Sequence, residues 1–235
     1  MMMFFSGARR FGALMVRTRG RAALLVAAVA LACGIAAPAA SATSKRQLAK
    51  DLNGMWAFVI QTPTSQNPFT STNNRCVHLA PQLLAPMQAF APPGVSSTCT
   101  VKPGTRVFIS ELSAECSTAE PPPFHGDNPA QLRACSRSVL LGPVGDFFTH
   151  RLTLDGANVP LAFIQAAPQR VTVPADNILG VPGPQKALSD AAGWLAILHP
   201  MTPGTHHVVI HFGGTFQGSL LEEVNHITII VKPGA

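Results

Sequence analysis

Short runs of β-branched and aromatic residues, bounded by glycine, proline, asparagine or aspartate, constrain the fold of this chain more than any other feature. Eight such runs follow one another: "MWAFVIQT", "TRVFISEL", "FFTHRLTL", "VPLAFIQA", "QRVTVP", "GWLAIL", "THHVVIHF" and "VNHITIIV". Such runs are typical of β-strands, and the 21 prolines and 19 glycines of the chain supply the turns between them. The pattern predicts an all-β fold, an antiparallel β-sandwich of the jelly-roll or immunoglobulin-like type.

Turns and helices interrupt these runs at a few places. Asp155-Gly156 lies between two apolar runs and predicts a hairpin with a two-residue type I′ turn. The segment "HFGGTFQGSLLEEVNHITIIV" predicts a second hairpin, with a longer loop, that closes the chain. "KRQLAKDLNG" within residues 43–55 predicts a lead-in helix. "DNPAQLRACSRSVL" predicts a short one, capped by Asp127 or Asn128 with Pro129 in its first turn. Long surface loops are expected in "QTPTSQNPFTSTNNRC" and "APMQAFAPPGVSS".

Residues 1–42 have the pattern of a secretory signal peptide. Five arginines without an acidic residue precede the apolar run "AALLVAAVALACGIAA", and small residues at Ala40 and Ala42 form an A-x-A cleavage site. We therefore expect cleavage after Ala42 and a secreted or periplasmic protein with no stable membrane span. Two alternatives are a retained anchor, for which the run is short, and a lipoprotein attached through Cys33.

The charge balance excludes one class of partner. Five of the 17 Lys and Arg residues lie in the leader, which leaves twelve against 11 Asp and Glu in residues 43–235. Nucleic-acid binding is not expected, because no basic stripe remains to contact phosphates. The remaining length is enough for one β-sandwich domain over residues 43–235.

Four cysteines follow the leader, and an even number in an exported chain predicts two disulfides. Sequence alone allows three connectivities. We favour Cys76–Cys99 and Cys116–Cys135 because each closes a short loop, worth about 3 kcal/mol in the chain-entropy model. The alternative, a zinc site, lacks a C-x2-C pair.

Histidines gather in the run from residue 205 to 212. On a strand His207 and His211 share one face, and His206 takes the other. His207 and His211 would lie about 13 Å apart, too far to share a metal ion. We therefore expect no metal, with His207 and His226 across the hairpin as a weak candidate pair. The favoured interpretation is that His211 or His207 pairs with Glu222 or Glu223 on a solvated face.

A second polar cluster surrounds the later disulfide. Carboxylates beside a histidine can form an acid/base pair or hold a cation. Glu111 and Glu115 are an even number of residues apart and are expected to face the same side. The alternative is a polar surface loop made rigid by prolines 121–123. The weak catalytic candidates are Glu111, Glu115, Glu120, His125 and Asp127.

Familiar enzyme motifs are missing from the sequence. It contains no G-x-S-x-G, H-E-x-x-H, P-loop or G-x-G-x-x-G segment. Triads are recognised by geometry, so a hydrolase or lyase using the carboxylates of 111–127 with a histidine stays an alternative. A carbohydrate-binding module is another, although the chain has no Tyr and only Trp56 and Trp194. Trp194, in an apolar run, is expected in the core.

The last third of the chain resembles an uncharacterised family of secreted bacterial proteins. The resemblance is carried by "AAGWLAILHPMTPGTHHVVIHFGGTF" and "VNHITIIV", close to a pattern L-x-P-L-x-P-G-x-H-x-I-x-F-x-G. The upstream stretches "CTVKPGTRVFISELSAECS", "LRAC", "LDGANV" and "VPADNILGVPG" extend it over about residues 97–231. Met201 replaces the usual Leu, and His226 stands where Tyr is typical. The resemblance implies a secreted β-sandwich and implies no activity.

Together these features predict a secreted, disulfide-stabilised, non-catalytic binding or envelope-associated module. Its ligand is an extracellular or envelope component that the sequence does not identify. No cofactor is expected.

Overall fold

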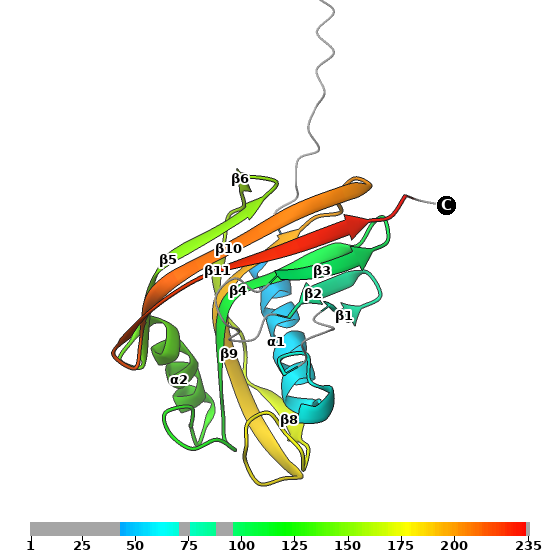
Figure 1. Ribbon diagram of the computed structural model, residues 1–235. Coiled ribbons are helices and arrows are strands. Elements are labelled where there is room, and N and C mark those ends of the chain that lie inside the picture. Colours follow the sequence, from blue (N-terminus) through cyan, green and yellow to red (C-terminus); the bar gives the residue numbers. More distant parts are fainter. Residues whose placement is uncertain (1–42, 71–75, 88–95, 234–235) are drawn as a thin grey trace, which may run out of the picture. The chain divides into compact units, whose positions relative to one another are not determined.

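A computed structural model describes residues 43–70, 76–87 and 96–233 (Figure 1). The predicted leader, including Cys33, lies outside these residues. The helices are α1 (Lys45–Gln61) and α2 (Pro129–Leu141), with a 3₁₀ turn at Thr64–Gln66. The strands are β1 (Cys76–Ala80), β2 (Leu83–Pro86), β3 (Ser96–Val101), β4 (Arg106–Ser117), β5 (Gly145–Leu154), β6 (Ala157–Asn158), β7 (Ala162–Gln165), β8 (Gln169–Val173), β9 (Gln185–Leu198), β10 (Gly204–Phe216) and β11 (Ser219–Val231).

The strands form two sheets that pack together. Sheet A has the order β1-β2-β4-β9-β7, with β8 also paired to β9, and sheet B has the order β3-β11-β10-β5-β6. β2 runs parallel to β4, and β3 parallel to β11, while the other pairs are antiparallel. The prediction of a mostly β fold is confirmed, but the sheets are mixed rather than purely antiparallel. The parallel partners are distant in the chain or separated by a strand of the other sheet, so no hairpin sets their direction.

The core between the sheets is built from alternate residues of the long central strands. Val107 and Ile109 of β4 belong to the same buried cluster as Val208 and Ile210 of β10 and Ile229 of β11. A strand buries every second side chain on one face. These positions therefore hold the sheets together, and the intervening residues of β10 and β11 face outward.

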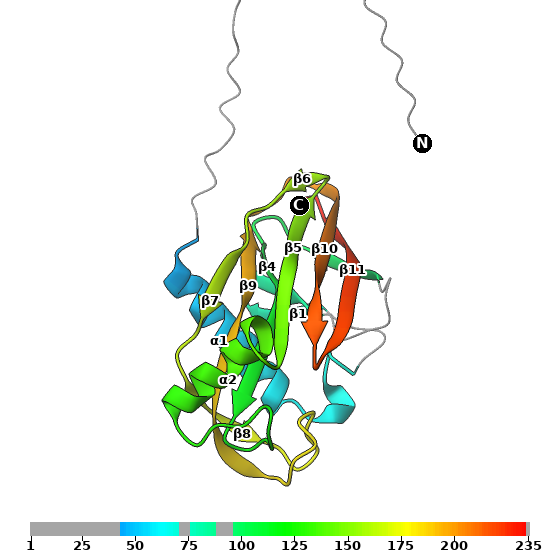
Figure 2. The ribbon, with the colours of Figure 1, turned by 90° about the vertical axis from the view of Figure 1, so that its left-hand side faces the viewer.

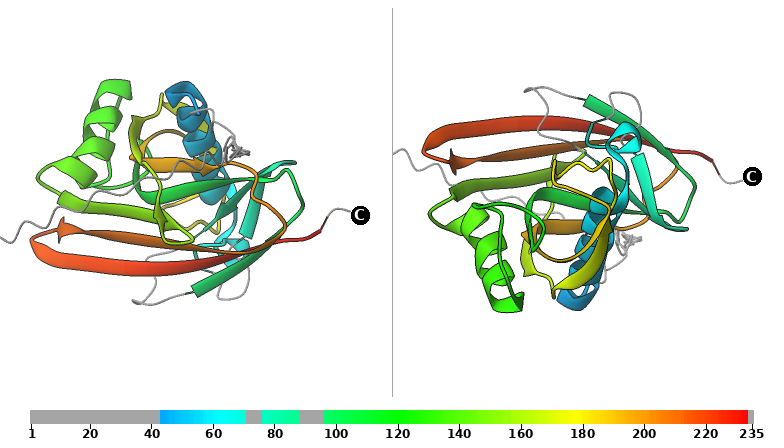
Figure 3. Two further views of the ribbon diagram at one scale, coloured as in Figure 1. Left: turned by 90° about the horizontal axis from the view of Figure 1, so that it is seen from above. Right: turned by 90° about the horizontal axis from the view of Figure 1, so that it is seen from below.

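Helix α1 covers the face of sheet A that is turned away from sheet B (Figure 3). Its buried residues Leu48, Leu52, Met55 and Val59 recur every three or four positions, the spacing of one helical face. The Ser44 side chain caps the helix by accepting from the Gln47 N–H at 3.2 Å. The prediction of a strand in "MWAFVIQT" is wrong, because this segment is the last part of the helix and presents its apolar residues at helical rather than alternate spacing.

Helix α2 begins as predicted. Asn128 is its N-cap and accepts from the N–H groups of Ala130 and Gln131 at 3.1 Å, with Pro129 in the first turn. The helix packs against β4, β5 and β9 and is tied to β4 by the Cys116–Cys135 disulfide. The other disulfide joins Cys76 to Cys99. The predicted disulfide connectivity is therefore confirmed.

Both predicted hairpins form, but the first has a shorter second strand and the second a shorter turn than expected. Asp155 and Gly156 both have positive φ, +50° and +81°, and form the predicted two-residue turn. However, the pairing with β5 is short: Ala157–Asn158 pairs with it, and the Val159 N–H donates to the Leu152 carbonyl oxygen at 2.9 Å. The chain then crosses to sheet A, where β7 lies beside β9 (Figure 2). The β10–β11 turn is shorter than predicted, since Phe216 already pairs with Ser219.

Two further strands, β1 and β2, lie mainly between the two stretches expected as long loops and overlap them only at Cys76, Ala85 and Pro86. Within the part of the chain that the structure describes, no helix is long and apolar enough to cross a membrane.

Candidate functional site

A cavity of about 540 Å³ lies where α2, the β10–β11 turn and the segment after β8 approach the end of β4. Its size falls within the range of small-molecule sites, roughly 300–1,000 Å³. Its walls are mostly apolar. The apolar lining residues are Trp56, Val59, Phe69, Leu112, Ala114, Phe124, Val139, Leu140, Phe147, Ile178, Leu179, Phe216 and Leu221.

The edge of β4 forms one wall of this cavity. β9 pairs with one side of β4, whereas β2 pairs with the other side only at Arg106 and Val107. In the described residues the rest of that side therefore has no strand beside it until the bridge between Ser117 and His125. Four consecutive residues of β4, from Leu112 to Glu115, line the cavity as a result.

A β-bulge in β4 decides which side chains face the cavity. Ser110 pairs with Leu195 and Leu112 with Trp194, so Glu111 is an extra residue. A bulge reverses the alternation of the residues that follow it. The expectation that Glu111 and Glu115 face the same side is therefore wrong. Glu111 reaches His150 of sheet B, whereas Glu115 shares its face with Ser113, which contacts Trp56 of α1.

Glu115 is an almost fully buried acid at the cavity wall, 5% exposed. Its Oε1 has no hydrogen-bond partner. Burial raises the pKa of Glu115 well above its ordinary value, and the negative charge of Glu120 raises it further. Burial also raises the pKa of Glu120, although hydrogen bonds from Glu115 and Ser117 oppose the shift. The two carboxyl groups therefore hold a proton more readily than ordinary acids.

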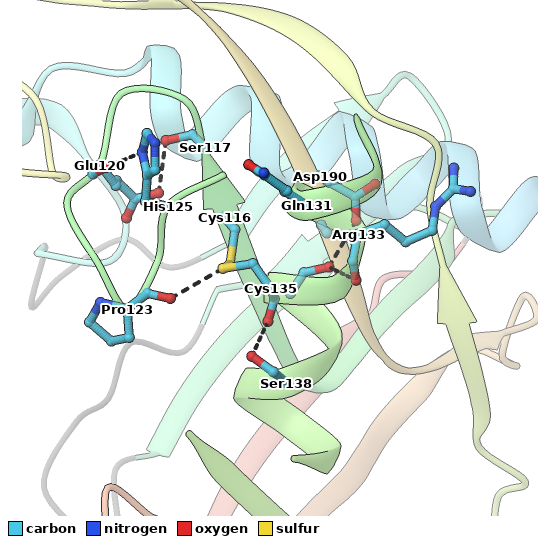
Figure 4. Close-up of a disulfide and its surroundings, with 12 residues drawn as sticks. Cys116, Ser117, Glu120, Pro123, His125, Gln131, Arg133, Cys135, Ser138 and Asp190 are labelled. Carbon is cyan, nitrogen blue, oxygen red and sulfur yellow. Dashed lines mark hydrogen bonds between the residues drawn. A yellow bond between two sulfur atoms is a disulfide. The ribbon is translucent and has the colours of Figure 1, made fainter. Parts of the chain in front are cut away.

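The loop that carries Glu120 is fixed at both ends (Figure 4). The Ser117 hydroxyl donates to Glu120 Oε2 at 2.8 Å, and the Glu120 carbonyl lies 2.7 Å from His125 Nδ1. The loop also contacts the adjoining disulfide, where Cys135 Sγ lies 3.2 Å from the Pro123 carbonyl oxygen. Glu120 is therefore held in place beside Glu115.

A third acid, Glu223, lines the same cavity from sheet B. It sits at an inward position of β11, 6% exposed, and burial raises its pKa. The cavity lining thus includes Glu115, Glu120 and Glu223 but no lysine, arginine or histidine. An apolar cavity with only acidic charged groups favours a ligand that brings hydrogen-bond donors.

A smaller hollow of about 70 Å³ adjoins the large one and shares Trp56, Phe69 and Glu223 with it. Glu111 lines this hollow. Its carboxylate lies 3.0 Å from His150 Nδ1, and His150 Nε2 lies 3.1 Å from the Phe147 carbonyl.

The ring of His150 is further held by Trp194. The two rings stack with their centroids 3.6 Å apart. Trp194 packs against the core as expected.

The other predicted catalytic candidates lie at the surface. His125 Nε2 is 3.0 Å from Asp127 Oδ1, and this hydrogen bond raises the pKa of His125. Its second ring nitrogen already faces the Glu120 carbonyl. Of the five candidates, Glu111 therefore lies at the small hollow beside His150, Glu115 and Glu120 form an acid pair at the large cavity, and His125 and Asp127 form an exposed pair on the loop.

The histidines of β10 have separate partners. His211 Nε2 lies 2.8 Å from Glu222, which confirms the expected surface pair, whereas Glu223 points inward. His206 Nδ1 lies 2.7 Å from Asp155 Oδ2 in the neighbouring turn.

The weak metal candidates, His207 and His226, do not face each other directly. His207 pairs with Thr228, and His226 with Val209. Across the described ranges, no group of three or more His, Cys, Asp or Glu side chains could hold a metal ion.

Sequence reasoning found Glu115 and Glu120 but missed the cavity, Glu223 and His150. A signal for Glu223 existed, because Val231, Ile229 and Ile227 mark the inward positions of β11. Continuing that alternation places Asn225 and Glu223 inside. No comparable signal indicated the bulge at Glu111.

No protein-family model matches the chain, and no curated protein is significantly similar to it. The resemblance to a family of secreted bacterial proteins stays a prediction.

Proposed function

We propose that residues 43–235 form an exported β-sandwich module that binds a small, largely apolar molecule without transforming it. The observation that carries this proposal is the cavity of about 540 Å³ beside β4, with its apolar walls and few acidic groups. The two disulfides indicate an oxidising, extracytoplasmic compartment. Delivery there by the predicted signal peptide belongs to the proposal.

The histidines favour binding over hydrolysis or lysis. A general base needs a ring nitrogen that can reach the substrate proton. Both ring nitrogens of His150 are occupied, by Glu111 and by the Phe147 carbonyl, and those of His125 by Asp127 and the Glu120 carbonyl. Neither histidine lines the large cavity.

Sugar binding through a flat aromatic surface has less support. Trp56 faces the cavity and donates to the Ser113 hydroxyl at 3.2 Å, while Trp194 stacks on His150. Among the described residues, neither belongs to the exposed large hydrophobic side chains.

The proposal is tested by titrating the purified protein with the apolar fluorescent probe N-phenyl-naphthylamine. We expect saturable uptake with enhanced emission. Filling the cavity with Ala114→Phe, or with Leu221→Trp at its mouth, should abolish uptake. Ala157→Phe, on exposed strand β6, is the matched control and should bind as the parent does. Absence of saturable uptake by the parent, or uptake unchanged by both cavity variants in folded protein, would contradict the proposal.

A further inference from the structure

The charged groups at the cavity limit the kind of polar end that a bound molecule can carry. Three glutamates line the cavity, and none of the lining residues is a cation. A ligand with a carboxylate or phosphate end would bring like charges together, which is unfavourable in surroundings of low dielectric constant. The apolar walls favour a hydrocarbon body. Together they favour an amphiphilic ligand whose polar end donates hydrogen bonds.

Glu115 adds a second, independent observation. Its side chain is 95% buried, since it is 5% exposed, and its Oε1 lacks any hydrogen-bond partner. Leaving a buried polar atom unpaired costs about 1–3 kcal/mol. Oε1 is closed to solvent in this structure, so the Glu115 side chain must turn toward the cavity to accept from a ligand donor, and the new hydrogen bond would recover this cost. An alkylammonium group has N–H donors and no acceptor, and its charge matches the acids.

We infer that the ligand of this cavity is an amphiphilic amine, whose ammonium group is bound by the neighbouring carboxyl groups of Glu115 and Glu120 while its hydrocarbon part occupies the apolar walls. The inference rests on the proposed function and names the chemical class of its ligand. Charge-assisted hydrogen bonds are about twice as strong as neutral ones, so the amine should bind better than an alcohol of the same length.

The raised pKa values agree with this assignment. Without a ligand, burial disfavours the charged forms of Glu115, Glu120 and Glu223. A bound ammonium group would offset that cost by placing a positive charge beside the carboxylates.

The test compares n-octylamine, octanol and octanoate, which share one chain length and differ in the polar end. Binding is measured by calorimetry and by Trp56 fluorescence, with Trp56→Phe to assign the signal. We expect octylamine to bind about tenfold tighter than octanol, a difference typical of one charge-assisted contact, and octanoate to bind weakest.

Two variants locate the effect. The double substitution Glu115→Gln, Glu120→Gln should remove the advantage of octylamine over octanol. Circular dichroism and a cooperative urea transition show that the variant is folded. Glu222→Gln, which neutralises an exposed acid on the outer face of β11, should keep the advantage.

The outcomes separate the inference from the proposed function. Equal binding of the three compounds, a preference for octanoate, or an amine advantage that survives the double substitution would overturn the inference while the cavity still binds apolar molecules. If none of the three compounds binds, the proposed function fails and the inference with it.

Discussion

Glu115 is an acid in surroundings that disfavour its charge. It lies beside Glu120 and within the influence of Asp190, and both raise its pKa in addition to burial. A carboxyl whose pKa rises on folding binds its proton more tightly in the folded protein. The free energy of unfolding therefore falls as the pH rises from the unfolded pKa, near 4.5, through the folded one. Glu115 thus lowers stability at neutral pH, a cost that is common at binding sites.

Glu115→Gln is expected to raise the stability of the protein at pH 8 and to change it little at pH 4. The glutamine keeps the size of the side chain and removes the charge that burial disfavours, and at pH 4 the parent carboxyl is already protonated. Urea unfolding at both pH values measures the difference, with Glu222→Gln as the exposed control. A variant that is less stable than the parent at pH 8 would contradict the assignment of a buried, destabilising acid.

His206 is expected to stabilise the protein below about pH 6.5, unlike its neighbour His207. Its hydrogen bond to Asp155 raises the pKa of His206 and lowers that of Asp155. The contribution is therefore complete above the ordinary Asp pKa of 3.8 and below the ordinary His pKa of 6.5, and it is lost as the pH rises through the folded His206 value.

Thermal melts of His206→Gln at pH 5.5 and pH 9 check this expectation. The loss of stability should be larger at pH 5.5. His207→Gln, on the outer face, should change stability by no more than about 0.5 kcal/mol at either pH. An equal effect of the two substitutions would mean that the Asp155 pair contributes nothing.

At the scale of single elements, the bulge in β4 requires a glycine opposite it. Gly193 of β9 pairs with Ser113, and a Cβ at this position would lie 2.6 Å from Ser113 Cβ and 2.7 Å from the Leu112 carbonyl oxygen. Both atoms belong to the strand just after the bulge. Glycine is needed here for close approach of two backbones.

Gly193→Ala should therefore destabilise the protein by about 1–3 kcal/mol, the usual cost of overpacking. The control is Gly54→Ala in α1, where an added Cβ meets nothing within 4 Å. This change should stabilise the protein by roughly 0.5–1 kcal/mol, because alanine favours helices over glycine. Denaturant unfolding of both variants gives the comparison, and a neutral Gly193→Ala would show that the two strands can move apart.

Element types were predictable where local pattern and final environment agree. The strand at "THHVVIHF" and the capped helix at Asn128 follow from alternation and from capping chemistry. The helical structure of "MWAFVIQT" was not predictable in this way. Its β-branched and aromatic residues are common in strands, whereas in the folded protein the segment is a helix that is stabilised by packing on sheet A. Tertiary contact outweighs propensity there.

At the scale of the whole molecule, the topology was the least predictable feature. The crossing of the chain from β6 in sheet B to β7 in sheet A, and the parallel pairing of β3 with β11, depend on contacts between distant residues. The cavity arises from the same long-range arrangement, since its lining comes from α1, α2 and both sheets. Local sequence could therefore indicate Glu115 and Glu120 but not what surrounds them.

The two disulfides should contribute similarly to stability and differently to binding. Their sequence separations, 23 and 19 residues, predict about 3 kcal/mol each. Only Cys116–Cys135 adjoins the cavity, because Cys116 follows Glu115 and Cys135 lies in the helix that supplies Val139 and Leu140.

Replacing each cysteine pair by alanine tests this difference. Both double variants should lose similar stability in urea, but only Cys116→Ala, Cys135→Ala should weaken uptake of the fluorescent probe. Equal weakening in both variants would show that uptake follows overall stability rather than the fastening of α2.

The extra residue at Glu111 also bears on how relatives of this protein could be detected. In a lineage that lost this one residue, Leu112 and Ala114 would turn away from sheet B, and Ser113 and Glu115 would turn toward it. Such a protein could keep Glu115, Glu120 and Glu223 and still lack the site. The cavities of two such proteins can therefore be compared only when both chains have the bulge residue in β4 and the two bulges are aligned. The number of residues before Glu115 matters as much as their identity.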